Sequence, residues 1–466
     1  MSKSSDKPIV VDDLSTFHTL TSRRDFVRLV AMGGALVLTG GLVAACEDSS
    51  NVAGLSGPGT GATLTIDFSM GDVALLQFLY LLEQLEADFH SRVVANFAQS
   101  DFTSADQLVL TDVANHDVIH RDVLGGLLGA ADTASIAPLY GSLSFRTRAA
   151  TLAQAVTMKD WVVGAYDGLA PYFTNTANLA IAMKLASVEA RHSAALHDLI
   201  SPLSTGFAPL PFEPASTLDD VATNLQPLIE QKLAFASEPA PLSSSQPTPA
   251  SSQASAEVMA ALQACLLVAQ LQSDFYGRAL AVSGLIPAAD VTVFATTASH
   301  EASHVATLQS LITSRGGVVP TAPAFDYTAK GSLPGFTFLS TQFTTFAMVA
   351  QALEDLGVRT FKGQLAALAQ DTSALISVLS MHAVQARHAC EVRRVRGKKG
   401  WVTSNNRDDL PAFLQPVYDG EDNTNQGGVN ALTLAAGIGG STTASEAFDE
   451  ARTTAQTMTV LAFFLP

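Results

Sequence analysis

Two pairs of side chains in the first half of the chain combine a carboxylate with a histidine three residues later. The pairs are Asp117 with His120 and Glu189 with His192. On an α-helix, residues at this spacing lie on one face, so both members of a pair can bind the same ion. Two such pairs, with one more carboxylate from each of two further helices, form the ligand set of two-metal centres in four-helix bundles.

Two more carboxylates can complete this set. Glu83 lies in the segment before the first pair, and Asp160 lies in the segment between the pairs. Several carboxylates offset the charge of two divalent cations and can bridge them, whereas imidazole favours iron or manganese over magnesium. The six residues therefore predict a di-iron or di-manganese centre. Its expected chemistry is that of a ferroxidase or peroxide-reducing oxidoreductase, for metal handling or stress protection.

Long segments with apolar residues at helical spacing must position these ligands. The first four cover about 71–94, 105–129, 148–172 and 176–200. A second set covers about 257–283, 288–315, 336–369 and 371–395. Because four helices of this length form a bundle, the sequence predicts an all-α fold of two tandem four-helix bundles.

Shifts in composition predict the order of the domains. The stretch EPAPLSSSQPTPASSQASA is rich in Pro and Ser, cannot bury a core and indicates a linker. The end of the chain is less regular than either bundle. The expected parts are a signal at 1–46, a flexible tether at 47–65, a first bundle at 66–200, a linker at 201–256, a second bundle at 257–395 and an irregular tail at 396–466.

The two halves repeat each other in sequence. NHDVIH, ending at His120, corresponds to SHEASH, ending at His304, and VEARH corresponds to VQARH, ending at His388. DWVVGAYDG, from Asp160, corresponds to DLGVRTFKG, from Asp355. The connection between the second and third helices is longer in the second half, and a long link at this place is typical of a bundle with one long crossover.

The second half holds an incomplete copy of the ligand set. Ala269 stands where the first half has Glu83, and Gln385 stands where it has Glu189. A neutral amide does little to offset the charge of a metal ion, so a complete two-metal site is not expected there. The weaker candidates for metal binding are Glu86, which shares a helical face with Glu83, and Glu301, His304, Glu354, Asp355 and His388.

These segments resemble the ferritin-like domain family that includes plant desiccation-related proteins. LLEQLEADFH, ALEDLGVRTFKG and the paired H[DE]xxH and ARH segments carry the resemblance, over about residues 66–200 and 257–395. The closing segment from Ala444 is also similar to the end of such proteins. The resemblance implies a helical bundle with a capacity for metal. Asp117 and Asp160 depart from it, since the ferritin pattern prefers the longer Glu at both positions.

Two other interpretations compete with the di-metal centre. His300, Glu301 and His304 spell HEASH, a match to the HExxH motif of zinc proteases. The corresponding segment of the first half reads HDVIH, and the repeat already accounts for the spacing, which favours the bundle. The second alternative is a non-catalytic pseudo-ferritin, a surface scaffold or partner-binding lipoprotein whose polar residues only satisfy one another in the core.

The first residues of the chain predict its compartment. Arg23 and Arg24, in SRRDFV, precede an apolar, Gly-rich run and resemble a twin-arginine export signal. The run ends in LVAAC, which resembles a bacterial lipobox with Cys46 as the lipidated residue. We therefore expect a periplasmic or cell-surface lipoprotein held to the membrane by its lipid. An uncleaved membrane anchor is the alternative.

Composition excludes other classes. The chain has 26 Lys and Arg against 43 Asp and Glu, a formal charge of −17, and no basic stripe follows the leader. Nucleic acid is therefore not an expected partner. Three cysteines cannot form a disulfide framework, and Cys265 and Cys390 lie among apolar residues, as small buried side chains do.

Overall fold

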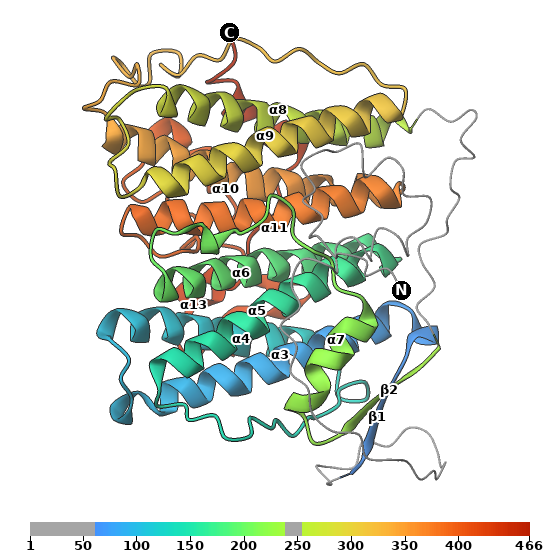
Figure 1. Cartoon of the computed structure of the whole chain (residues 1–466). Coiled ribbons are helices and arrows are strands. Elements are labelled where there is room, and N and C mark those ends of the chain that lie inside the picture. The colour runs from blue at the N-terminus through green and yellow to red at the C-terminus, as the bar shows by residue number, and fades with distance from the viewer. Residues whose placement is uncertain (1–60, 238–253) are drawn as a thin grey trace, which may run out of the picture. The chain divides into compact units, whose positions relative to one another are not determined.

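The computed structural model describes residues 61–237 and 254–466 (Figure 1). The predictions for the leader, including Arg23, Arg24 and Cys46, lie outside the described residues. Within them, long α-helices dominate, and the only sheets pair two short strands each. The predicted all-α fold of two tandem bundles is confirmed.

Four helices make up the first bundle. They are α3 (Asp72–Ala95), α4 (Ser104–Leu128), α5 (Arg148–Leu169) and α6 (Thr176–Ile200). Helix α3 packs along α4, and α5 packs along α6. The interior faces are lined by Leu, Val, Phe and Ala side chains that are almost fully buried. Removal of this apolar surface from water is the main force that holds such a bundle together.

The second bundle repeats this arrangement with α8 (Ala256–Leu280), α9 (Val291–Ser314), α10 (Phe343–Leu368) and α11 (Thr372–Val395). The link from α9 to α10 is longer than the link from α4 to α5, as the sequence predicted. Among the described residues, α8 alone is long and apolar enough to span a membrane. However, 61% of its most apolar window is buried inside the protein, as in the core helix of a bundle.

Short elements connect and cover the bundles. The strands are β1 (Thr63–Asp67), parallel to β2 (Lys232–Ala236), and β3 (Asn425–Gln426), antiparallel to β4 (Val429–Asn430). The short α-helices are α7 (Leu218–Leu225), α12 (Ala431–Leu434), α13 (Ser441–Glu446) and α14 (Thr454–Leu461). The 3-10 helices are η1 (Phe68–Met70), η2 (Phe97–Gln99), η3 (Ala170–Tyr172), η4 (Thr205–Phe207), η5 (Gln226–Leu228) and η6 (Ala412–Val417).

The two bundles contact each other through α6 and α11, which lie side by side (Figure 1). Arg191 of α6 reaches into the second bundle, where its Nη2 lies 3.0 Å from Oδ1 of Asp355. Arg387 of α11 reaches the other way, with Nη2 3.1 Å from Oδ1 of Asp160. The same two positions of each repeat therefore form reciprocal ion pairs, as in a two-fold interface between identical subunits.

The segment that follows each bundle crosses over to the other one. After α6, the carbonyl oxygen of Pro211 accepts a hydrogen bond from Nε2 of His304, at 2.7 Å. After α11, the carbonyl oxygen of Ala447 lies 2.6 Å from Nε2 of His120 in the first bundle. We expected a linker at 201–256 and an irregular tail at 396–466. Instead, residues 201–237 and 396–466 are packed covers, because scattered aromatic residues, among them Phe207 and Phe448, are buried against the bundles.

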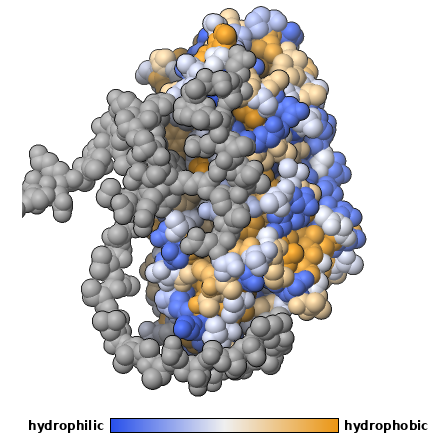
Figure 2. All heavy atoms as spheres, turned by 90° about the vertical axis from the view of Figure 1, so that its right-hand side faces the viewer, coloured by the Kyte–Doolittle hydropathy of each residue, from blue (hydrophilic) through white to orange (hydrophobic). Residues whose placement is uncertain are grey.

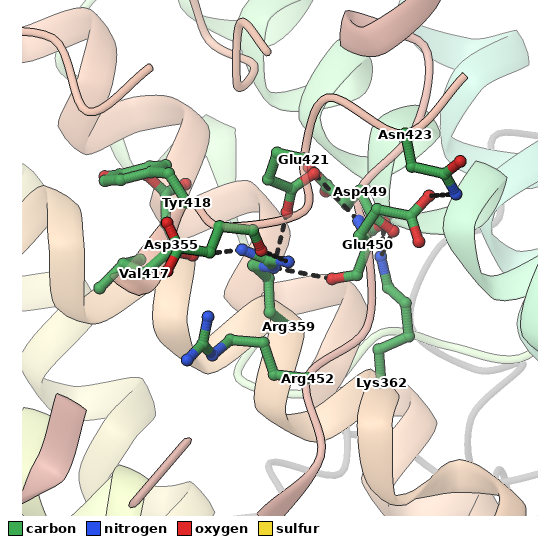
Figure 3. A network of polar contacts seen from close by, with 12 residues as sticks. Asp355, Arg359, Lys362, Val417, Tyr418, Glu421, Asn423, Asp449, Glu450 and Arg452 are labelled. Carbon is green, nitrogen blue, oxygen red and sulfur yellow. Dashed lines mark hydrogen bonds and ion pairs between the residues drawn. The ribbon is translucent and has the colours of Figure 1, made fainter. Parts of the chain in front are cut away.

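A network of polar contacts fastens the second cover to α10 (Figure 3). Arg359 donates from Nε to the carbonyl oxygen of Glu450, at 2.8 Å, and pairs with Glu421 at 2.7 Å. The ammonium of Lys362 donates to the carbonyl oxygen of Asp449, at 2.7 Å, and to the hydroxyl of Ser187 in α6, at 2.6 Å. The network therefore joins the cover to both bundles.

Each cover runs back along the third helix of its own bundle, where a glycine makes room for it. The amide of Ser216 donates to the carbonyl oxygen of Gly164, at 2.8 Å. The amide of Arg452 donates to the carbonyl oxygen of Arg359, at 2.9 Å. A Cβ atom added at Gly168 would overlap the backbone of Ser216, and one at Gly363 would overlap the backbone of Arg452. Both glycines stand at the same place in the repeat.

We expect Gly168→Ala to destabilise the protein by about 1–3 kcal/mol, because the added methyl group must push the cover away from α5. Gly277→Ala is the control, since Gly277 lies in α8 with nothing within 4 Å of the added atom. There, alanine should stabilise the helix by roughly 0.5–1 kcal/mol. Urea unfolding of both variants measures the difference, and equal effects would contradict the packing argument.

Candidate metal centre

The first bundle gathers four of the predicted ligands in its interior. Glu83, Asp117, His120 and Glu189 each offer a donor atom, and these atoms all lie within 4.8 Å of one another. The four side chains are fully buried and come from α3, α4 and α6. Nδ1 of His120 lies 2.8 Å from a carboxylate oxygen of Glu189 and 3.5 Å from one of Glu83.

Helix α5 contributes a lysine to this cluster instead of a carboxylate. Lys159 is fully buried, and its Nζ lies 2.7 Å from Oδ1 of Asp117 and 3.2 Å from Oε1 of Glu86. It also donates to Glu189. The ammonium therefore stands among three carboxylates. Sequence reasoning missed this residue.

The structure places Asp160 outside the cluster, which differs from our prediction. Its carboxylate accepts from the hydroxyl of Ser193, at 2.5 Å, lies 2.9 Å from Nε2 of His197 and pairs with Arg387 of the second bundle. Successive helical residues are about 100° apart around the axis, so a shift of one residue exchanges Lys159 for Asp160 on the inner face. The carboxylate of Asp160 serves the contact between the bundles.

Burial and neighbouring charges set the protonation of the cluster. Burial opposes ionisation of Asp117, but the Lys159 ammonium outweighs it and holds the pKa of Asp117 at about 2. Burial likewise opposes charge on His120, but Glu83 and Glu189 raise its pKa to about 10. Burial raises the pKa of Glu86 well above its ordinary value. Two anions, Asp117 and Glu189, thus face two cations, Lys159 and His120.

Several donor atoms of the cluster have no hydrogen-bond partner among the described residues. They are Oε2 of Glu83, Oε2 of Glu86, Nε2 of His90 and Nδ1 of His192, whereas Oε1 of Glu86 lies 3.2 Å from the Lys159 ammonium. A buried polar atom without a partner costs on the order of 1–3 kcal/mol, so a group of them at one point indicates a site for a ligand. Carboxylate oxygens and imidazole nitrogens are the donors that iron and manganese accept, so the residues present fit such an ion.

The second bundle has a smaller cluster at the same place. Glu301, Glu354 and His388 offer donor atoms within 4.8 Å of one another, and all three are buried. Gln385 donates to Glu301, at 2.7 Å, and accepts from Gln272, at 2.8 Å. Two neutral amides thus stand where the first bundle has Glu189 and Glu86, and three donors remain.

The other weaker candidates of the second bundle lie at the edge of this cluster or outside it. His304 donates its Nε2 hydrogen to Pro211, and its Nδ1 lies 3.4 Å from Glu301. Asp355 lies outside the cluster, where it pairs with Arg191 and with Arg393, whose Nη2 is 2.8 Å away. Its place matches that of Asp160 in the first bundle.

Comparison with known families agrees with this geometry. The chain matches the family described as Ferritin-like domain over residues 71–202 and 257–398, which together make up more than half of its length. The chain belongs to the ferritin-like domain family. No curated protein and no solved structure matches it.

Both ferritin-like bundles support the histidine of their fourth helix with a second histidine. Nε2 of His192 lies 2.9 Å from Nδ1 of His116, and Nε2 of His388 lies 3.0 Å from Nδ1 of His300. His300 and His304 therefore have separate partners and do not point at one common zinc ion, as the HExxH interpretation requires.

The second cover adds residues to the ferritin-like site of the first bundle that sequence reasoning missed. The ring of Trp401 lies edge-on to those of His116 and His192, with centroids 5.2 and 5.6 Å apart. A carboxylate oxygen of Glu446 lies 3.7 Å from Nε2 of His116. The repeat does not reveal these contacts, because they come from outside both matched segments.

Proposed function

We propose that the first ferritin-like bundle binds a divalent transition metal, iron or manganese, for metal handling or for oxidation of ferrous iron by dioxygen or peroxide. Glu83, Asp117, His120 and Glu189 would hold it, and His120 would release its Nδ1 proton as the metal binds. The observation that carries the proposal is the buried group of donor atoms within 4.8 Å of one another. Because α5 offers Lys159 and not a carboxylate, the proposal is for one ion in this bundle, where the sequence alone favoured two.

When bound, the metal would supply the one-electron chemistry that the side chains lack. The chain's own residues hold and shield the site. Tyr166 donates its hydroxyl hydrogen to Glu83, at 2.6 Å, and Ala447 fixes the ring of His120 from behind. Such outer hydrogen bonds orient metal ligands. The ring of Phe448, which is itself buried, lies 5.8 Å from that of His120.

Metal analysis tests this proposal. We expect the full-length protein, purified without chelators and loaded with Fe(II) or Mn(II), to retain about one equivalent. Glu189→Ala with His192→Ala should lose it, whereas Gln385→Ala with His388→Ala, the same change in the second bundle, should keep it. Retention by the first double variant would contradict the assignment of ligands.

A second candidate function is a metal-free scaffold, and the charge balance of the first bundle favours it. Lys159 and His120 already neutralise Asp117 and Glu189. A scaffold needs a surface on which a partner can bind. Figure 2 shows hydrophobic residues interspersed with hydrophilic ones on the face turned to the viewer. Folded protein without stoichiometric metal would favour this candidate over the first.

Export as a twin-arginine lipoprotein completes the proposal, and the leader sequence supports it. Kinship with the desiccation-related proteins, which the closing segment suggests, belongs to the same proposal. We expect Cys46→Ser to release the protein from the membrane fraction, because one lipid-modified residue supplies the anchor. Cell fractionation measures the change, and a variant that stayed in the membrane fraction would favour an uncleaved anchor.

A further inference from the structure

Lys159 occupies a position that differs between the two bundles in charge but not in burial. It precedes Asp160, and Glu354 precedes the corresponding Asp355 in the repeat. Both side chains are fully buried on the third helix of their bundle. Lys159 lies 2.7 Å from Asp117, and Glu354 lies 3.4 Å from His388. The third helix therefore points the same position at the centre of each bundle, with an ammonium in one and a carboxylate in the other.

The ammonium stands where a two-metal centre needs a carboxylate of its third helix. Glu189 binds it directly, and Nδ1 of His192 has no hydrogen-bond partner although it lies 3.6 Å from Oδ1 of Asp117. In a two-metal centre, two carboxylate-x-x-His pairs and one further carboxylate from each of the other two helices surround the ions. Here the third helix supplies a positive charge, which would repel a cation from the same place.

We propose that Lys159 takes the place of the second metal ion, as a built-in cation that limits the first bundle to one metal and keeps it folded without any. The first part of this proposal, that the Lys159 ammonium replaces the charge of a metal ion, rests only on the contacts of Lys159. The second part, that the bundle binds one ion, also rests on the proposed function. A buried pair of carboxylates needs a compensating cation, and Lys159 supplies it at hydrogen-bond distance from Asp117 and Glu189.

The test converts the lysine into the residue that the second bundle has. Wild-type protein, Lys159→Glu and, as a control for loss of a buried ammonium elsewhere, Lys362→Gln are loaded with Mn(II) and then analysed for bound metal. We expect Lys159→Glu to retain one equivalent more than the wild type and Lys362→Gln to retain the same number. Thermal melts in EDTA are a second readout, in which Lys159→Glu should lose its cooperative transition and the wild type should keep it.

The outcomes separate this inference from the proposed function. If the wild type holds no metal and Lys159→Glu binds it, the inference stands and the proposed function fails. If both proteins hold one equivalent, the inference is overturned and the proposed function stands. If Lys159→Glu does not fold even with metal present, the melting temperature of Lys159→Gln tests the inference instead. A lower melting temperature in EDTA that Mn(II) restores supports the inference, and an unchanged melting temperature overturns it.

Discussion

Arg191→Met is expected to destabilise the folded protein by about 3–5 kcal/mol, the cost of removing one partner from a buried ion pair. Arg191 is fully buried between the bundles, and its guanidinium donates to Asp355, at 3.0 Å, and to Asp449, at 2.9 Å. Methionine fills similar space but leaves both carboxylates with one cation fewer in a medium that solvates them poorly. Urea unfolding at neutral pH measures the loss.

Arg387→Met is the matched comparison, because Arg387 stands at the same place in the second repeat. Arg387 pairs with Asp160, whose side chain is 39% exposed, and with Glu213, whose side chain is 9% exposed. The two carboxylate partners of Arg191 are at most 1% exposed, so water can take over more of the lost interaction at Arg387. We expect a clearly smaller loss of stability than for Arg191→Met. Equal losses would show that solvent access does not decide the cost of these pairs.

Trp401→Ala is expected to destabilise the protein by roughly 3–5 kcal/mol and also to weaken metal binding in the first bundle. Trp401 is 2% exposed, and its ring packs edge-on against His116 and His192. Its loss leaves a cavity beside the two histidines, so the ring of His192 is no longer held 3.5 Å from the proposed ligand Glu189. Metal retention and urea unfolding are measured on the same samples.

Phe464→Ala provides the control for this prediction. Phe464 is also fully buried in the second cover, but its ring packs near Tyr327, with centroids 6.4 Å apart, in the second bundle. The variant should lose a comparable amount of stability and keep its metal. If both variants lost metal alike, the effect of Trp401 would reflect general loosening of the fold.

Several positions that are identical in the two repeats hold the fold together. Asp160 matches Asp355, and Arg191 matches Arg387, because each repeat contributes the same ion pair to the contact between the bundles. Gly168 matches Gly363 because a cover passes each third helix. We had interpreted the matched aspartates as metal-site residues, since a periodic pattern locates a helix better than it fixes its rotation.

The site residues were predicted best where a motif fixed their rotation. Spacing of three residues placed Asp117 with His120 on one face, and the structure brings both next to Glu189. No motif marks Lys159, because a lysine in a helix is normally a surface residue. Its burial is compensated by three carboxylates from other helices, which lie next to its ammonium group.

The sequence by itself determined the helices, the repeat, the long crossover and the family, because each depends on local periodicity or on motifs within one helix. The tertiary structure alone decided which side of α5 faces the cluster and where the two covers lie. It decided as well that Trp401 and Ala447 support the first bundle from outside it. These features depend on contacts between different helices and covers, from 30 positions apart for Lys159 and Glu189 to 327 for His120 and Ala447, and no local pattern encodes such contacts.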